Sequence, residues 1–591
     1  MNVINVLENK SGLSKKQLYV FLGISALWII GCLCLPLLVS FQPVINFITW
    51  FEESFIHRII PSIWLEAEMT NSMWLETATW IGMAGIVIYF LFFFLFFYND
   101  FFSRILAKKR TVVFVMATVS AVITFIILFH ANWVFGDDYV IIKSTATNRY
   151  FTFSDNIFIG RFFPLTYMHY NVPFFITRRL GMTTGLPVEA HFAFLPVFFI
   201  MSYVCLYSLF NKIEPFRNRK HPVLSLFFAS TFFLLGNTFF VIFMFLILPE
   251  TPGIMLFSIF MLMYYKALET DKIKYYVIAL LAAAYNTYCK EPVFGVFLVI
   301  AFTNHLFRYK KESKRERIFY TGLIVNAVLF LVLYYFFSYR NTKVFYNSIV
   351  YEKIGETVDR VHFLITNPIL IIIFLFGLIR LYYITIKKDR KHLYYDSLLF
   401  AGIAYTFAYI ALKMTTNDYY FMPSIILFLP SLVYWTKYMY EKKRKYALCL
   451  FFMLVPIYVY NSGWAAITTK AIWKERQEFT PYITNLLSEY NSDKEFVWYR
   501  EMELDSDWEK NIYYFFLNYF NKSAKTEFFT VENRALDSID LKQNTLLFIP
   551  LTNNSLPPRE FRKTLDEFIE TLQENNFELY NDRYNTLIYK Q

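Results

Sequence analysis

Two adjacent carboxylates, Asp137 and Asp138, follow a long apolar run in the stretch NWVFGDDYVIIKS. Close carboxylates raise one another's proton affinity, which can suit one of them to act as a general base while the other stays ionised. Neighbouring residues of a helix point about 100° apart, so both can aim at one atom only if the loop bends, as Gly136 permits. The alternative is structural: one aspartate caps a short helix and the other is solvated.

Other polar segments carry side chains that could bind a phosphate-bearing substrate. Arg161, in FIGRFFPLTYMHY, has a planar fork of donors that fits phosphate, although an arginine at a membrane surface often only extends its charge into water. Lys290 and Glu291 stand together in NTYCKEPVFG, where they either serve a substrate or simply neutralise each other. Glu250 in LPETPG and Lys413 in LKMTTNDYYFMP complete the candidate substrate-binding residues.

The elements that must position these residues are helices in a bilayer. The chain has 591 residues and is 57% hydrophobic and 21% aromatic, which exceeds what the core of a water-soluble protein needs. Because a membrane-crossing helix takes about 20 apolar residues, we predict an α-helical polytopic membrane protein with about thirteen spans. The predicted spans are 18–41, 77–98, 112–132, 188–210, 223–247, 253–268, 275–288, 292–308, 318–338, 364–385, 397–412, 421–436 and 446–464.

The placement of basic residues predicts how the chain crosses the membrane. The net charge is +11, but the basic residues are spread over short loops, which argues against nucleic acid as a partner. The segments KKRT, RNRKHP, DKIK, RYKKESKRER, KKDRKH and EKKRK alternate with acidic or neutral loops, as expected for cytoplasmic loops. The N-terminus is therefore predicted to be cytoplasmic, and every candidate residue named above would lie at the outer face.

The chain divides into three predicted parts. Residues 1–111 hold an N-terminal tail and two spans, and residues 112–464 hold the remaining spans with a long outer loop, 133–187, that is typical of surface helices. In residues 465–591, EFVWYR, TLLFIPL and NTLIYKQ are predicted strands, and PPREFRKTLDEFIETLQENN is a predicted amphipathic helix. We therefore expect a small C-terminal α/β domain outside the membrane.

The cysteines give no sign of a disulfide framework or a metal site. Cys32, Cys34, Cys205, Cys289 and Cys449 all fall in or at the ends of predicted spans, without zinc-like spacing. We predict neither a metal nor another cofactor.

At these residues the sequence resembles the GT-C superfamily of polytopic membrane glycosyltransferases, including the bacterial O-antigen glucosyltransferase type. That superfamily has an acidic motif in its first large outer loop, matched here by FGDDY and followed by GRFFP, and some members carry a Lys–Glu pair in a later outer turn, matched by CKEP. The resemblance covers roughly residues 112–464. The two spans before this part depart from the usual beginning of the family.

The resemblance implies an inverting glycosyltransferase with an outward-facing site. Its donor would be a sugar on a polyprenyl phosphate, and its acceptor a glycan, a lipid or a protein. Asp137 corresponds to the acidic residue that deprotonates the acceptor hydroxyl in related enzymes, with Asp138 supporting it. The cations would stabilise charge on the departing phosphate.

Two other function classes stay open. A transporter or flippase of lipid-linked saccharide would also place cations near phosphate, but it more often shows internal repeats or helices broken near the midplane, and no clear repeat is present. A scaffold whose outer domain binds another envelope protein is the third class. The abundance of Lys, Asn, Ile, Tyr and Phe fits an AT-rich bacterial genome, so we expect a bacterial inner-membrane protein.

Overall fold

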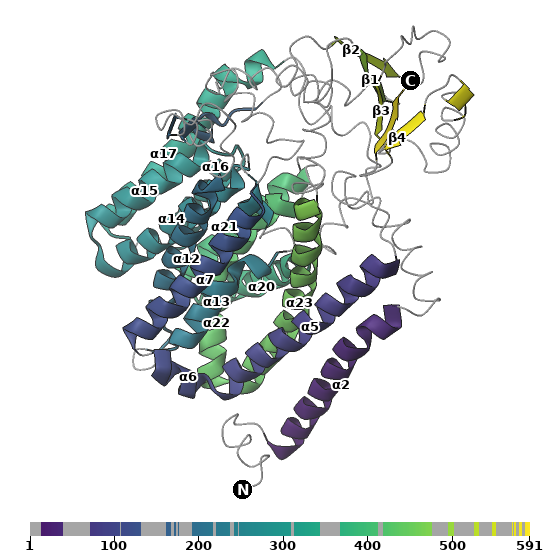
Figure 1. Ribbon diagram of the computed structural model, residues 1–591. Helices are drawn as coiled ribbons and strands as arrows, with labels where there is room; N and C mark the ends of the chain where they lie inside the picture. The colour runs from purple at the N-terminus through teal and green to yellow at the C-terminus, as the bar shows by residue number, and fades with distance from the viewer. Residues whose placement is uncertain are drawn as a thin grey trace.

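The computed structural model describes most of the predicted membrane region and the strands that follow it (Figure 1). The described residues are 14–39, 71–106, 108–131, 161–166, 171–172, 175–176, 192–216, 220–236, 241–245, 248–308, 312–342, 367–411, 418–474, 495–500, 525–530, 546–550, 570, 573–574, 578–581 and 586–590.

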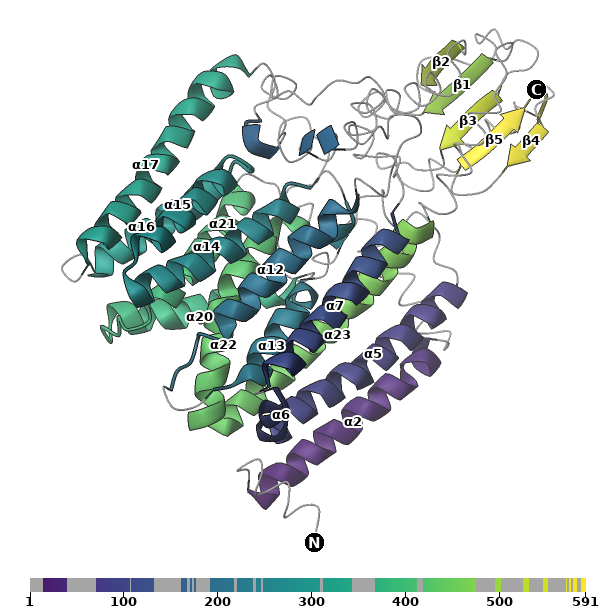
Figure 2. The same ribbon diagram turned by 60° about the vertical axis from the view of Figure 1, so that its left-hand side comes forward.

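Most of these residues form one bundle of helices, and each predicted span overlaps a helix of this bundle (Figures 1 and 2). The helices are α2 (Lys15–Val39), α5 (Asn71–Phe97), α6 (Asn99–Leu106), α7 (Lys109–Phe129), α12 (Phe194–Phe210), α13 (Pro222–Thr231), α14 (Glu250–Thr270), α15 (Ile273–Thr287), α16 (Val293–Arg308), α17 (Lys314–Phe337), α20 (Pro368–Thr385), α21 (Leu393–Ala411), α22 (Met422–Lys442) and α23 (Arg444–Lys474).

Eight stretches of the described residues are long and apolar enough to cross a membrane. They correspond to α2, α5, α7, α14, α17, α20, α22 and α23. Helices α12 and α16 are apolar but shorter, with 17 and 16 residues. The chain is therefore an integral membrane protein, whereas the total of about thirteen spans stays a prediction.

The centre of the bundle is formed by α14 and α22. Within their most apolar stretches, 67% of the α14 residues and 89% of the α22 residues are buried in the protein, against 17% for α2 and for α7. Helices at the edge of a membrane protein keep an apolar face toward lipid, which explains the low burial of α2 and α7. Helix α14 packs against α12, α15 and α22, so it is surrounded by other helices of the bundle.

Polar contacts distinguish the two ends of the bundle. At the C-terminus of α14, Asp271 adopts a left-handed conformation with φ 50°. Its carboxylate accepts from Arg315 in the first turn of α17, the helix that Ser313 caps. We name this the Asp271 end. The N-terminus of α14 starts at Glu250, and we name the opposite end the Glu250 end. The 21 residues of α14 separate the two ends by about 31 Å.

A buried lysine links two segments at the Asp271 end. Lys437 of α22 is fully buried and donates to Phe210 O at 2.8 Å, to Ile213 O at 2.9 Å and to Glu214 Oε1 at 2.8 Å. These three acceptors match the three N–H donors of its ammonium group, so the charge is tolerated without water. The contacts fix the loop that follows α12 against α22.

The chain predicted as one span over 223–247 is interrupted. Helix α13 ends at Thr231, and the short 3-10 helices η2 (Phe232–Leu234) and η3 (Val241–Met244) follow before α14 begins. An amphipathic or apolar pattern gives no sign of such an interruption, because it reports the polarity of side chains and not the partners of backbone groups.

Side chains from neighbouring helices satisfy the backbone at this interruption. Asn461 Nδ2 donates to Leu234 O at 3.0 Å, and Thr251 Oγ1 donates to Ile242 O at 2.7 Å. Gly236 lies so close to α22 that a Cβ atom there would be 2.7 Å from the methyl group of Met422. Irregular backbone at membrane depth is tolerated where protein groups replace the lost helical hydrogen bonds, as they do here.

The C-terminal part contains a five-stranded sheet in the order β2-β1-β3-β5-β4, drawn beyond the end of α23 in Figure 2. The predicted strands EFVWYR, TLLFIPL and NTLIYKQ correspond to β1 (Glu495–Arg500), β3 (Leu546–Pro550) and β5 (Thr586–Lys590). The sequence did not predict β2 (Lys525–Thr530) or β4 (Glu578–Asn581).

Strands β1, β2 and β3 run parallel, and β5 is antiparallel to β3 and β4. Parallel strands need long crossover connections, usually helices. The predicted amphipathic helix falls almost entirely outside the described residues, so the α/β class of this part stays a prediction.

Candidate functional site

Four of the predicted site residues lie together at the Glu250 end. Glu250 is the first residue of α14, and Lys290 and Glu291 occupy the turn between α15 and α16. Arg161 begins the described segment 161–166, which lies within the outer loop 133–187 predicted from the sequence. The structure brings these side chains together as two ion pairs that link three segments of the chain.

The remaining predicted site residues are Asp137, Asp138 and Lys413, and they lie outside the described residues. Their catalytic and substrate-binding roles therefore stay predictions.

The first ion pair joins the N-terminus of α14 to the turn. Lys290 Nζ lies 2.8 Å from Glu250 Oε1, and the two side chains are only 7% and 1% exposed. Pro249 precedes Glu250 and starts the helix, and a carboxylate in the first turn is favoured by the positive end of the helix dipole. The ammonium group also lies 4.6 Å from the centroid of the Tyr420 ring, a cation–π contact.

The second ion pair joins the same turn to the Arg161 segment. Arg161 Nε donates to Glu291 Oε1 at 3.0 Å, and the backbone N–H of Phe162 donates to the same oxygen, also at 3.0 Å. Burial raises the pKa of Glu291, but the charges of Arg161 and Lys290 outweigh it and hold this pKa below its ordinary value. Glu291 is thus a stable anion that orients both the side chain and the backbone of its partner segment.

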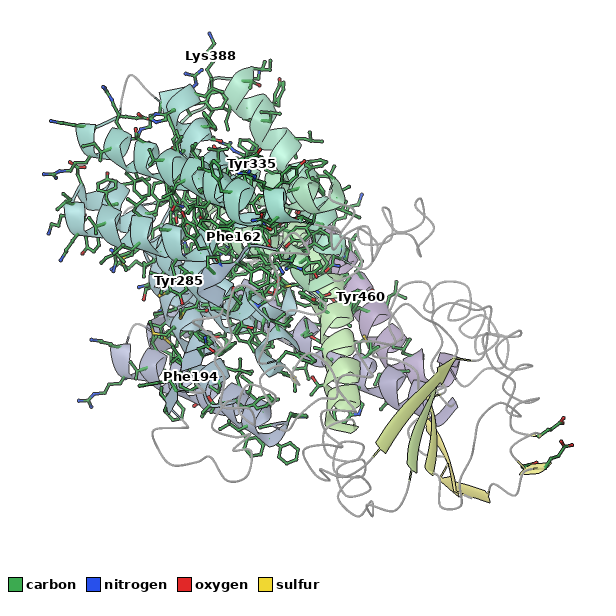
Figure 3. All side chains as sticks on the ribbon, turned by 90° about the horizontal axis from the view of Figure 1, so that it is seen from above. Phe162, Phe194, Tyr285, Tyr335, Lys388 and Tyr460 are labelled. Atoms are coloured by element: carbon green, nitrogen blue, oxygen red, sulfur yellow. The ribbon has the colours of Figure 1, made fainter. Side chains whose placement is uncertain are left out.

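Backbone contacts strengthen the same junction. Leu165 N donates to Tyr288 O at 3.1 Å, and Thr166 Oγ1 donates to Cys289 O. Phe162 packs against α17 through Phe337, with ring centroids 6.2 Å apart. Figure 3 views the bundle from above and shows Phe162 between the labelled residues of α15 and α17. The Arg161 segment is therefore anchored on the helices instead of lying free on the membrane surface.

The pairing corrects one alternative drawn from the sequence. Lys290 and Glu291 do not neutralise each other by a direct ion pair: Lys290 pairs with Glu250, and Glu291 pairs with Arg161. Adjacent residues in a turn point in different directions, so each side chain meets a different segment. Spacing in the sequence could not reveal this exchange of partners.

Sequence reasoning missed a group of buried tyrosines next to Glu250. Tyr405 and Tyr409 of α21 are 2% and 1% exposed, and Tyr405 OH donates to Tyr409 OH at 3.3 Å. The ring of Tyr409 stacks on that of Tyr420, with centroids 4.9 Å apart, and both α21 tyrosines lie within electrostatic range of Glu250. The available signal was the i, i+4 spacing in AYTFAYI, which places two hydroxyls on one face of an apolar helix.

The carboxylate of Glu250 is incompletely satisfied. Lys290 stands at ion-pair distance from Oε1, but neither carboxylate oxygen has a partner in hydrogen-bond geometry among the described residues. A buried acceptor without a hydrogen bond costs about 1–3 kcal/mol, more when it is charged. The site therefore presents a carboxylate with capacity for further donors, beside two cations and three aromatic rings.

No protein-family model matches the chain, and no curated protein matches it. Among solved structures, two crystal structures of ArnT from Cupriavidus metallidurans are similar, one bound to undecaprenyl phosphate and one in the apo state. Their sequence identities are 9% and 11%, and each match covers 81% of this chain and 97% of that chain with a TM-score of 0.43. ArnT is a GT-C glycosyltransferase, the superfamily that the FGDDY and CKEP motifs resemble.

Proposed function

We propose that this protein is a membrane glycosyltransferase of GT-C type that transfers a sugar from a polyprenyl-phosphate donor to a glycan, lipid or protein acceptor outside the cytoplasm. The observation that carries the proposal is the meeting of Arg161, Glu250, Lys290 and Glu291 at the Glu250 end, from three segments of the chain. Buried and partly buried charges at a membrane edge are costly, so their concentration favours a functional site.

Helix α7, which precedes the predicted catalytic loop in the sequence, ends on the side of Glu250. Helix α7 starts at the Asp271 end. The short helix α6 comes before it, and Asn99, the first residue of α6, contacts His221, which pairs with Glu441 at the end of α22. The 21 residues of α7 span about 31 Å and so bring Ala131 to the Glu250 end. Asp137 follows six positions later, within about 20 Å of Ala131 by chain length.

The proposed reaction is an inverting displacement. Asp137 accepts the proton of the acceptor hydroxyl as its oxygen attacks the anomeric carbon of the donor sugar, and Asp138 supports that carboxylate. The bond between the anomeric carbon and the phosphate oxygen breaks, and its electron pair leaves with polyprenyl phosphate. Arg161, Lys290 and Lys413 stabilise the negative charge that develops on this phosphate.

The ion pair with Glu250 leaves Lys290 able to bind phosphate. An ammonium group has three N–H donors, and among the described residues Glu250 Oε1 is the carboxylate oxygen at ion-pair distance from Lys290. The carboxylates also hold the two cations in place before a ligand arrives, which reduces the ordering required on binding.

We further propose that the N-terminus is cytoplasmic in a bacterial inner membrane, and that the Glu250 end and the C-terminal part face outside. The C-terminal part, 465–591, would orient the acceptor or a partner, because every candidate catalytic residue precedes it. Full activity on the physiological acceptor after truncation behind Lys470 would contradict this role.

One observation favours the transporter alternative. The interruption between α13 and α14 lies directly before Glu250, and broken helices beside charged residues are common where transporters bind their substrates. A transporter would carry lipid-linked saccharide across the membrane without breaking its sugar–phosphate bond.

The deciding experiment uses purified protein in lipid vesicles with labelled undecaprenyl-phosphate sugars and an envelope-glycan fraction as acceptor. A glycosyltransferase releases undecaprenyl phosphate and labels the acceptor. Movement of intact donor between leaflets, without release of undecaprenyl phosphate, would support the transporter and contradict the proposed reaction.

A further inference from the structure

Glu250 is the least satisfied charged group of the described site. Its side chain is 1% exposed, Lys290 Nζ lies 2.8 Å from Oε1 as an ion-pair partner, and neither oxygen has a partner in hydrogen-bond geometry among the described residues. An ionised carboxylate can accept about four hydrogen bonds. A ligand rich in hydroxyl groups would supply donors that the described protein groups do not.

The surroundings of Glu250 fit a sugar ring. Tyr420 lies beneath the Lys290 ammonium and stacks on Tyr409, which is hydrogen-bonded to Tyr405. A sugar combines apolar C–H faces with hydroxyl edges, so aromatic rings and one buried carboxylate match the two kinds of surface that it presents. Small-molecule sites commonly combine apolar and aromatic walls with a few placed polar groups in this way.

The negative charge of Glu250 favours contact with the sugar and disfavours contact with the phosphate. A phosphate group has only acceptor oxygens and negative charge, so the Glu250 carboxylate repels it, whereas Lys290 and Arg161 attract it. Lys290 contacts Glu250 directly, so a phosphate bound by Lys290 would lie on the side of the ammonium group away from the carboxylate. One glycosyl phosphate could contact both Lys290 and Glu250 at once.

The first turn of α14 is held firmly. Asn286 Nδ2 of α15 donates to Gly253 O at 3.3 Å, and the Asn286 side chain is buried beside Lys290's turn. This contact fixes the helix end that carries Glu250 against the helix end that leads to Lys290. A carboxylate on a helix end fixed in this way can discriminate between sugars that differ in the position of one hydroxyl, because its backbone cannot follow a displaced donor.

We propose that Glu250, with the rings of Tyr405, Tyr409 and Tyr420, forms the subsite that recognises hydroxyl groups of the donor sugar. This inference rests on the proposed function and assigns to Glu250 a role in choosing the sugar, separate from the binding of phosphate by the cations.

The test compares Glu250→Gln with a matched control, Glu312→Gln. Glu312 is also a buried, ion-paired glutamate with one oxygen lacking a hydrogen bond, but it pairs with His305 near the Asp271 end. The probes are undecaprenyl phosphate and its glucosyl, galactosyl and mannosyl derivatives, whose affinities are measured on purified protein in nanodiscs.

We expect wild type to bind one glycosylated probe more tightly than undecaprenyl phosphate. Glu250→Gln should lose roughly tenfold or more of the affinity for that probe, because a hydrogen bond to a charged group is replaced by one to a neutral amide. Its affinity for undecaprenyl phosphate should be unchanged or higher, because a repelling charge is removed. Glu312→Gln should bind both probes as wild type does.

Three results would overturn the inference. One is a Glu250→Gln variant whose affinity changes by the same factor for the glycosylated probes and for undecaprenyl phosphate. Another is a wild type that prefers no glycosylated probe over undecaprenyl phosphate. Wild type that binds none of the four probes would overturn the proposed donor class as well.

A second variant covers the case in which Glu250→Gln does not fold. Glu250→Asp keeps the charge that pairs with Lys290 but withdraws the carboxylate by one methylene group. It should retain affinity for undecaprenyl phosphate and lose the preference for the glycosylated probe. An unchanged sugar preference in this variant would reject the subsite.

Discussion

Arg161 and Glu291 form an ion pair of 3.0 Å across 130 positions of the chain. The same carboxylate oxygen accepts from the backbone of Phe162, so it fixes the path of the segment as well as the direction of the arginine. Because Lys290 in the same turn pairs with Glu250, three segments meet at one turn. Changes in this turn should therefore affect both the charge of the site and the position of the loop that carries Asp137.

Asp137→Asn tests the proposed base. Asparagine keeps the approximate shape but cannot take the acceptor's proton, so single-turnover transfer should fall by roughly 10²–10⁴ while donor binding largely survives. Asp138→Asn should be milder. If the pair only caps a helix, both variants should work almost normally, because asparagine caps about as well as aspartate. A strong loss of transfer in Asp138→Asn alone would identify Asp138, and not Asp137, as the base.

Arg161→Ala and Lys413→Ala test the binding of phosphate. Each should weaken the affinity for undecaprenyl phosphate by roughly 10-fold, the effect of one charge-assisted hydrogen bond. The control is Lys212→Ala, which removes an exposed cation paired with Glu269 at the Asp271 end and should leave this affinity unchanged. Unchanged affinity in both test variants, with folding confirmed, would reject these two cations as phosphate ligands.

Lys290→Met tests the buried pair. It leaves the Glu250 carboxylate, which is 1% exposed, without its described counter-charge and should destabilise the protein by roughly 3–5 kcal/mol. Adding Glu250→Gln to the same chain should restore part of this loss, because no buried charge is then left unpaired. Equal stability of Lys290→Met and wild type in chemical unfolding would contradict the pairing seen in the structure.

Acidification should weaken the junction at Glu291. Because the folded protein holds the Glu291 pKa below its ordinary value of 4.5, this group contributes stability that is complete above that value and is lost as pH falls through the lowered pKa. The thermal midpoint should therefore fall more steeply below about pH 4.5 in wild type than in Glu291→Gln. Identical pH profiles for the two proteins would show that the group is not held as an anion.

Single cysteines test the orientation of the bundle. In a cysteine-free background, Arg340→Cys after α17 should react with a membrane-impermeant maleimide in intact cells, whereas Lys272→Cys at the Asp271 end should react only after permeabilisation. Both positions are exposed in the structure, so lack of labelling would not reflect burial. The reverse pattern would place the Glu250 end in the cytoplasm and rule out the proposed outer site.

The sequence by itself determined the helices and several strands. Runs of about 20 apolar residues are sufficient to define helices in a bilayer, because the backbone must satisfy its own hydrogen bonds there. The strands at 495–500, 546–550 and 586–590 were predicted from runs rich in aromatic and aliphatic residues. The strand KTEFFT at 525–530 was missed because it has a lysine and a glutamate among few apolar residues.

Only the tertiary structure decided which charges meet. The sequence indicated that Arg161, Glu250, Lys290 and Glu291 lie at one face, since span counting fixes the end of a helix at which each residue lies. It could not assign Lys290 to Glu250 and Glu291 to Arg161, because partners depend on how helices pack and rotate about their axes. The same packing placed Tyr409 and Tyr420 against each other beside Glu250, with ring centroids 4.9 Å apart, and made an apolar helix face part of the candidate site.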